Sequence, residues 1–469
     1  MLLLLLLAGA SGKTVNAARP PLFRAVTASD PGFGVHDNGT VIIGQQQASG
    51  LGILGLEGSF YTRTNDGVYH FLSGGKMRAP AGWNYWETDV HMRFDHWQSV
   101  DGTSNWTWTS KVYESSGVFD GTDRRGSTWA PMATYDAASE RWHLFYVSYR
   151  ASPAYRTPLG LYRNPDTNKP QALHYYTQFD GEIWHSISTV KGEGGIGGPY
   201  RDVGAVLNQE DLGGFSPSKD GWEGDHGCDM FFPFKLANGT WLALYGSEFG
   251  RFPDFELRRQ VGLARFEPST IPADRCALVT QFSAQACVLG QTFGCHAGNR
   301  TLWARGCRGS FQCGPATVTC DNSSETFCEQ SCDQGVFAGT WTRLSALNPL
   351  DSGFRPASPG IENPVVVRTS DGAWWVAVYH IYTGASVGVS WSRDGVTWTP
   401  QHGDVHLGSA VCGDTVTTAC GLVAEPSKGK GVYSLLYTAS GACSSGTCSS
   451  ESVCRAYLIN TAEQQLDTP

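Results

Sequence analysis

Short runs in which apolar and polar residues alternate recur along the chain, and most of them are rich in aromatic residues. They lie at about 68–74, 141–147, 240–247, 373–379 and 432–437. Several of these runs follow a turn that contains Asn-Gly or Asp-Gly. Alternation of this kind is typical of half-buried strands, and such turns are typical of hairpins. No long stretch outside the N-terminal leader has the 3.6-residue period of an amphipathic helix, so we predict an all-β protein.

About five such units recur along the chain. Each begins with a phrase that contains an acid or a Pro, and a strand, a polar turn and an aromatic strand follow this phrase. Irregular repeats of antiparallel hairpins are typical of β-propellers. We therefore predict a five-bladed β-propeller, in which the first strands of the blades converge on one axis. Acids at the starts of these strands would then gather at that axis. The phrases begin at Glu57, Trp129, Cys228, Ile361 and Ala424.

The predicted blades span about 57–116, 129–207, 222–268, 361–400 and 421–469. Residues 20–50 precede the first blade, and Thr40-Val41-Ile42-Ile43 is the clearest strand among them. Because a terminal strand often completes the last blade of a closed propeller, we expect this region to pair with the fifth blade.

A second recurrent phrase, Ser-x-Asp-Gly followed by Trp, occurs at 99–106 and at 392–398. Asp-Gly favours a tight hairpin turn, and the Trp is expected to pack against the outer strand. The phrase resembles the Asp-box of sialidases, but its spacing is one residue short. We therefore interpret it as structural.

The N-terminus predicts export. Residues 1–18 begin with a short apolar run followed by small residues, which is typical of a signal peptide, although a basic start is missing and a buried N-terminal element is the alternative. Five Asn-x-Ser/Thr sequons favour a secreted glycoprotein. No later segment has the length of a transmembrane helix, so we expect a soluble, secreted protein.

The cysteines indicate a separate, disulfide-rich unit. Eight of the 14 Cys lie within 276–332, where no Cys-x2-Cys pair occurs and His296 is the only His. Disulfides are therefore favoured over a zinc site. We predict an insertion at 276–340, between blades three and four, which divides the propeller into 19–275 and 341–469.

Composition and charge limit the function classes. The chain has 57 Gly and 16% charged residues, a balance that favours strands joined by tight turns. Its formal net charge of −9 argues against nucleic acid as a partner, because a phosphate backbone attracts a surface rich in Lys and Arg. We expect a monomer with no membrane partner.

The order of these motifs resembles the five-bladed propeller glycosidases, glycoside hydrolase family 43 and its relatives. The similarity covers roughly 50–270 and 355–440, and includes Trp129-Ala130-Pro131 and Gly198-Pro199-Tyr200. It implies a secreted glycoside hydrolase that acts on poly- or oligosaccharides. Those enzymes use an Asp base from the first blade, a pKa-tuning Asp from the second and a Glu acid from the third. This chain differs, because the first blade offers Glu57 and no acid stands beside Trp129.

Glycoside hydrolysis needs two carboxyl groups that flank the scissile bond. We predict Glu57 and Asp229 as this catalytic pair, since both open a first strand, although either acid is alternatively a turn or capping residue. Further acids and two indole rings are predicted to bind the substrate or to line the mouth of the pocket. These are Asp89, Trp129, Trp222, Glu223, Asp225, Glu362 and Glu425.

Other function classes stay open. The expected enzyme needs no cofactor, and the resemblance allows a structural calcium ion for which the sequence indicates no ligands. The main alternative is a non-catalytic propeller that binds glycans or proteins and keeps its acids as relics. A phosphorolytic enzyme is a third class, which would need a cluster of Arg or His for phosphate. Arg251, Arg258 and Arg259 form the only notable cluster after blade three.

Overall fold

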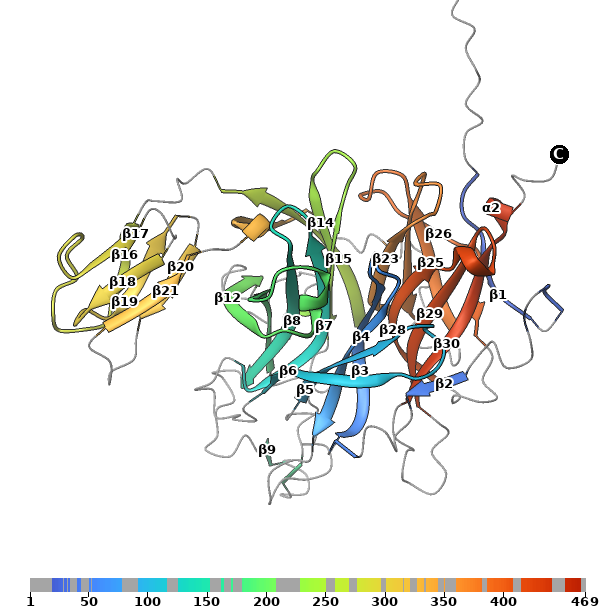
Figure 1. Ribbon diagram of the computed structural model, residues 1–469, viewed down its shortest axis with the longest axis horizontal. Helices are drawn as coiled ribbons and strands as arrows, with labels where there is room; N and C mark the ends of the chain where they lie inside the picture. The colour runs from blue at the N-terminus through green and yellow to red at the C-terminus, as the bar shows by residue number, and fades with distance from the viewer. Residues whose placement is uncertain are drawn as a thin grey trace, which may run out of the picture.

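A computed structural model gives the fold, and almost all of its regular structure is β-strand, which confirms the predicted all-β class (Figure 1). The residues that the structure describes are 19–27, 29–31, 33, 40–43, 50–51, 53–77, 92–115, 125–151, 162–163, 170–171, 179–207, 228–249, 258–269, 276–296, 301–314, 316–320, 327–332, 335–344, 350, 360–381, 386–407, 415–440 and 452–464.

Five antiparallel sheets follow one another along the chain, and we number them one to five. Sheet one contains β3 (Ile53–Arg63), β4 (Tyr69–Met77), β5 (Met92–Ser99) and β6 (Thr107–Glu114). Sheet two contains β7 (Ser127–Asp136), β8 (Arg141–Ala151), β11 (Phe179–Ser188) and β12 (Tyr200–Leu207). Sheet three contains β13 (Cys228–Lys235), β14 (Trp241–Phe249), β15 (Arg258–Pro268) and β22 (Gly339–Arg343).

The last two sheets each have one additional paired strand. Sheet four contains β23 (Glu362–Arg368), β24 (Trp375–His380), β25 (Ser386–Ser392), β26 (Thr399–Pro400) and β27 (Val405–His406). Sheet five contains β28 (Thr415–Ala424), β29 (Val432–Ser440), β30 (Ser452–Asn460), β1 (Phe23–Ala25) and β2 (Thr40–Ile43). The pairing of β1 with β30 confirms that an N-terminal strand completes the last sheet.

Short elements connect or flank these sheets. A separate hairpin joins β9 (Tyr162–Arg163) to β10 (Pro170–Gln171). The short helices are η3 (Glu193–Gly197), η5 (Gly335–Phe337), η6 (Pro426–Lys428) and α2 (Thr461–Gln464). Among the described residues, no helix has both the length and the apolar character needed to cross a membrane.

The first strands of the five sheets lie next to one another in a closed order, with β3 against β7, β7 against β13, β13 against β23, β23 against β28 and β28 against β3. The largest core cluster spans all five sheets and contains Leu72, Phe145, Phe231, Val378 and Leu435. The sheets therefore have a propeller-like arrangement, with their first strands at the centre.

The cysteine-rich segment forms a small unit of its own, which projects from one side of the molecule (Figure 1). One three-stranded sheet contains β16 (Cys276–Gln281), β19 (Gly309–Cys313) and β20 (Ala316–Cys320). The other contains β17 (Phe293–His296), β18 (Thr301–Arg305) and β21 (Phe327–Ser331). The predicted disulfides are confirmed, and they join Cys276 to Cys295, Cys287 to Cys307, Cys313 to Cys332 and Cys320 to Cys328.

The place of this unit differs from the expected one. It follows β15 and precedes β22, and these two strands pair within sheet three. The unit therefore interrupts one sheet instead of separating two. The five-residue strand β22 was not predicted, because 339–343 is too short to show a clear alternating pattern.

A buried polar network joins sheet one to sheet five. The Tyr69 hydroxyl donates to Glu425 Oε2 at 2.6 Å, and the Ser434 hydroxyl donates to Glu425 Oε1 at 2.5 Å. Tyr61 Oη lies 3.0 Å from Ser434 Oγ. Nearby, a Cβ atom on Gly421 would lie 2.5 Å from the backbone oxygen of Tyr61, so only Gly lets β28 approach β3 this closely. These contacts hold the first and last sheets together.

Two pairs of stacked histidines occupy similar places in sheets one and two. His70 Nδ1 lies 2.9 Å from His96 Nε2, and His143 Nδ1 lies 2.9 Å from His185 Nε2. Each pair joins the second and third strands of its sheet, and all four rings are buried. Burial lowers the pKa of His96 from its usual 6.5 to about 3 and also lowers the pKa of His70 and His185. His70, His96 and His185 are therefore neutral in the folded protein near pH 7.

We predict that Tyr69→Phe weakens the contact between sheets one and five. The change removes one of the two described donors to the buried Glu425 carboxylate. A buried acceptor that loses its donor costs about 1–3 kcal/mol. The free energy of unfolding, measured by urea titration, should fall by this amount. The control is Tyr135→Phe, since Tyr135 has no bond to a buried carboxylate among the described residues. Equal effects of the two changes would contradict the structural role of Glu425.

We also predict that acid destabilises the fold through the buried histidines. The unfolded chain binds protons below pH 6.5, whereas folded His96 stays neutral until about pH 3. Stability is therefore present above pH 6.5 and is lost as the pH falls from 6.5 toward 3. Each such residue contributes a slope of up to about 1.4 kcal/mol per pH unit.

Urea titrations between pH 6.5 and 5 test this prediction. His96→Gln should reduce the slope of the unfolding free energy against pH by up to about 1.4 kcal/mol per pH unit. The same change at the exposed His402 is the control. A slope that His96→Gln does not alter would show that this pair does not govern acid stability.

Candidate functional site

Every first strand contains a β-bulge at a similar distance from its C-terminal end. The bulges lie between Glu57 and Ser59 in β3, between Trp129 and Met132 in β7, and between Cys228 and Met230 in β13. They lie between Glu362 and Val365 in β23 and between Ala419 and Gly421 in β28. A bulge bends its strand and redirects side chains, and bulges are common beside active sites. Because the five strands are neighbours around the centre, we take this ring of bulges as the candidate site.

Three of the five bulges carry an acid that the sequence singled out. Glu57 pairs with Gly74 at the edge of the bulge in β3, and Asp229 is the extra residue in β13. Glu362 pairs with His380 at the edge of the bulge in β23. The structure describes the backbone of Glu57 and Asp229, and it describes the side chain of Glu362 as well. The backbone thus brings three predicted site residues to the ring of bulges, on three of the five first strands.

The Glu362 carboxylate has a buried neighbour. Glu362 Oε2 lies 3.6 Å from His380 Nδ1, and the exposed fractions of the two side chains are 13% and 4%. A largely buried carboxylate is stable only when nearby groups compensate for its lost hydration. His380 is suited to this role, and it limits the directions in which the carboxylate can point.

Asn363 follows Glu362 and fixes the backbone of the bulge. Its φ angle is 51°, a left-handed conformation that Asn adopts more easily than most residues. Its side-chain amide donates to Thr418 Oγ1 of β28 at 3.3 Å, and both residues are buried. A side-chain hydrogen bond therefore joins the bulge of β23 to β28, one residue before the bulge of that strand.

Trp129 pairs at the edge of the bulge of β7, and the unpaired residues of this bulge, Ala130 and Pro131, include no acid. Ala130 also has a positive φ angle, 47°, and Pro131 follows it. The Trp129 side chain is 8% exposed, belongs to the main core cluster, and donates from its indole N–H to Ser127 Oγ at 3.2 Å. This ring packs in the core and offers little surface for stacking on a sugar, contrary to the role predicted for it.

Glu425 lies away from the ring of bulges. Its sequence context, Ala424-Glu425-Pro426, looks like the start of a first strand, but Glu425 follows the end of β28 and Pro426 opens η6. Its carboxylate is buried and is held by Tyr69 and Ser434. It is therefore unavailable to a substrate at the bulges, and the structure corrects this prediction. Asp89, Trp222, Glu223 and Asp225 lie outside the described residues.

Sequence reasoning missed the residues that support Glu362. Asn363 is visible only as an Asn before Pro, a common turn signal, and Thr418 has no motif around it. His380 lies at the end of an aromatic strand, where a polar residue attracts no special attention. Their roles depend on pairing between strands that local sequence does not encode.

The described residues contain no cluster of carboxylates suited to calcium. Their only group of three potential ligands is Cys276, Cys295 and Cys313, and disulfides already engage these sulfur atoms. Oxygen ligands are what calcium prefers, so this group does not fit it. A structural calcium ion stays a prediction, and no chemical step below depends on a metal.

Several solved structures resemble this chain at low identity. A family 117 glycoside hydrolase from Zobellia galactanivorans has a TM-score of 0.48 and 12% identity, with 92% of each chain covered. An α-L-arabinofuranosidase from Lactobacillus brevis has a TM-score of 0.43 and 10% identity, over 88% of this chain and 94% of that one. A Cellvibrio cellulosa α-L-arabinanase complexed with arabinohexaose has a TM-score of 0.42 and 11% identity, over 86% and 91%. No protein-family model and no curated protein matches the chain.

We predict that the bulge at Asn363 depends on a left-handed backbone. Asn363→Gly and Asn363→Ala both remove the bond to Thr418, but only Ala places a Cβ atom in the unfavourable conformation. The Ala variant should be less stable than the Gly variant by about 1–2 kcal/mol in urea titrations. The matched control is Ala377, in regular β24, where Ala377→Gly should lower stability. An Ala variant at 363 that equals or exceeds the Gly variant would contradict the bulge geometry.

Proposed function

We propose that this protein is a secreted glycoside hydrolase built as a five-bladed β-propeller. In this proposal β1 closes the fifth blade, and the disulfide-rich unit is an insertion. The observation that carries the proposal is the ring of bulges, because three of its five first strands bear Glu57, Asp229 and Glu362 in or beside their bulges. Convergent carboxylates at one end of an axis are what hydrolysis of a glycosidic bond requires.

Glu57 and Asp229 are the proposed catalytic pair. One carboxyl group stays protonated and donates its proton to the leaving oxygen, while the other acts as base toward water or as nucleophile. Glu362 is the third carboxylate of the site. Its charge raises the pKa of a neighbouring acid when the two groups are close, because two like charges resist ionising together. His380 orients Glu362 and does not touch the substrate in this scheme.

The proposed substrate is a neutral poly- or oligosaccharide. The net charge of −9 and the acids at three bulges disfavour polyanionic chains. The proposed reaction needs water, two carboxyl groups and no cofactor. The four disulfides among the described residues agree with an oxidising compartment, which supports secretion.

We predict that the purified protein releases sugars from at least one of arabinan, xylan, galactan and fructan or from matching nitrophenyl glycosides. Glu57→Gln and Asp229→Asn should each lower kcat/KM by about 10²–10⁴-fold, the usual contribution of acid–base catalysis. Glu362→Gln is measured beside them, and its loss of kcat/KM shows how much the third carboxylate contributes. The control is Asp371→Asn, which changes an acid in the turn after β23, at the opposite end of that strand.

The outcomes separate the alternatives. Activity that survives both Glu57→Gln and Asp229→Asn, while Glu362→Gln abolishes it, would keep the enzyme and reject the pair. No activity on any of these substrates, together with measurable glycan binding, would favour the non-catalytic binding propeller. Circular dichroism on every variant ensures that a lost activity is not a lost fold.

A further inference from the structure

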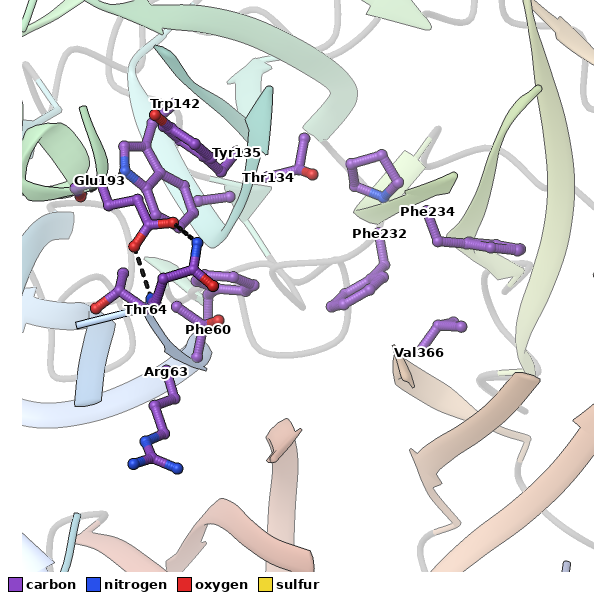
Figure 2. Close-up of a pocket in the computed structure, with 14 residues that line it drawn as sticks. Phe60, Arg63, Thr64, Thr134, Tyr135, Trp142, Glu193, Phe232, Phe234 and Val366 are labelled. Atoms are coloured by element: carbon purple, nitrogen blue, oxygen red, sulfur yellow. Dashed lines mark hydrogen bonds between the residues drawn. The ribbon is translucent and has the colours of Figure 1, made fainter. Parts of the chain in front are cut away.

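A pocket (Figure 2) is lined by residues that follow the bulges in four of the five first strands. Its volume is about 270 Å³, and its lining includes Phe60 of β3, Ala133 of β7, Phe232 of β13 and Val366 of β23. These residues lie three or four positions after the bulge acids or Trp129 in the same strands. At about 3.3 Å per residue, the pocket is roughly 10–13 Å further along each strand. It is therefore separate from the candidate active site.

Aromatic rings form much of the pocket wall. The ring centroid of Phe60 lies 6.5 Å from that of Trp142 and 6.4 Å from that of Phe232, and Tyr135 lies 5.3 Å from Trp142. Figure 2 shows these rings around the same space, with Phe234 to the right of Phe232. Such walls favour a ligand with at least one apolar face.

The charged groups at the rim already have partners. The Glu193 carboxylate accepts hydrogen bonds from the Asn65 backbone N–H, at 2.7 Å, and from the Asn65 side-chain amide. The Arg63 guanidinium lies 5.1 Å from the centroid of the Tyr69 ring and donates to the Gly67 backbone oxygen at 3.2 Å. A charged ligand would have to compete with these contacts, so the pocket favours a neutral one.

Hydroxyl groups supply the remaining polarity. Thr62 and Thr134 line the pocket from neighbouring first strands, and both are partly exposed. A hydroxyl both donates and accepts hydrogen bonds, which matches the hydroxyls at the edge of a sugar ring. The pocket is slightly smaller than the roughly 300–1,000 Å³ typical of sites for drug-sized ligands, so it suits a single ring.

We propose that this pocket is a second carbohydrate-binding site, which holds one neutral sugar residue of a glycan and takes no part in its cleavage. The apolar face of the sugar lies against the aromatic wall, and its hydroxyls bond to Thr62 and Thr134. This second site is inferred from the pocket itself and does not require the proposed hydrolysis. Its consequence for the full-length protein is a second point of contact with a long glycan.

The test measures glycan binding by affinity electrophoresis in gels that contain arabinan, xylan, galactan or fructan. The parent is full-length protein with Glu57→Gln and Asp229→Asn, which leaves the glycan intact. Added to this parent, Thr62→Val with Thr134→Val should weaken retention about tenfold. Thr134→Trp fills the pocket and should abolish the pocket's contribution. Thr399→Trp, on the exposed strand β26, is the control and should bind as the parent does.

A second readout separates this site from the catalytic one. In protein with intact acids, the threonine variants should leave kcat/KM on a nitrophenyl glycoside unchanged, since that substrate reaches only the bulge end. Retention that is equal in parent, threonine variants and Thr134→Trp, with all of them folded by circular dichroism, would overturn the second site. No retention of the parent in any of the four gels would overturn it too. Retention that depends on the threonines, in a protein without hydrolytic activity, would support this site and reject the proposed function.

Discussion

Closure of the ring of sheets is the constraint on which the rest of this structure depends. In a propeller-like fold each sheet packs face to face against its two neighbours, so the first and last sheets are covered only if they meet. Here β1 brings the N-terminal region onto β30, while Glu425, Tyr69 and Ser434 join sheet five to sheet one. Together with the apolar cluster that Tyr61, Phe71, Cys420 and Leu436 share, these contacts hold β28 against β3 and close the ring of bulges.

The sequence predicted the features that depend on neighbouring residues. Alternating aromatic runs indicated the strands, and the Ser-x-Asp-Gly phrases indicated tight turns. Both turns use the same bonds, in which Ser99 or Ser392 donates to the Asp two residues later. Gly102 and Gly395 supply the positive φ angles, at 65° and 75°. Cysteine density likewise indicated the disulfides, because that signal needs no knowledge of how distant segments pair.

The candidate site was harder to predict, because bulges interrupt the two-residue period of a strand. One extra residue moves every later side chain to the opposite face, so alternation alone does not show which acids face the axis. Glu425 illustrates a second difficulty. Its local phrase resembles that of Glu362, yet one residue lies after a first strand and the other lies at the beginning of one. Only the strand pairing separates these two cases.

The disulfide-rich unit leaves and rejoins sheet three at nearly the same point. Pro268, at the end of β15, pairs with Gly339, at the beginning of β22, and Ser269 donates a backbone hydrogen bond to Ala338. Topologically the unit replaces the turn of an ordinary hairpin. Its gain or loss during evolution would therefore leave the order and pairing of the five sheets intact. An outer hairpin of this kind is a place where a propeller can acquire a new module without refolding its core.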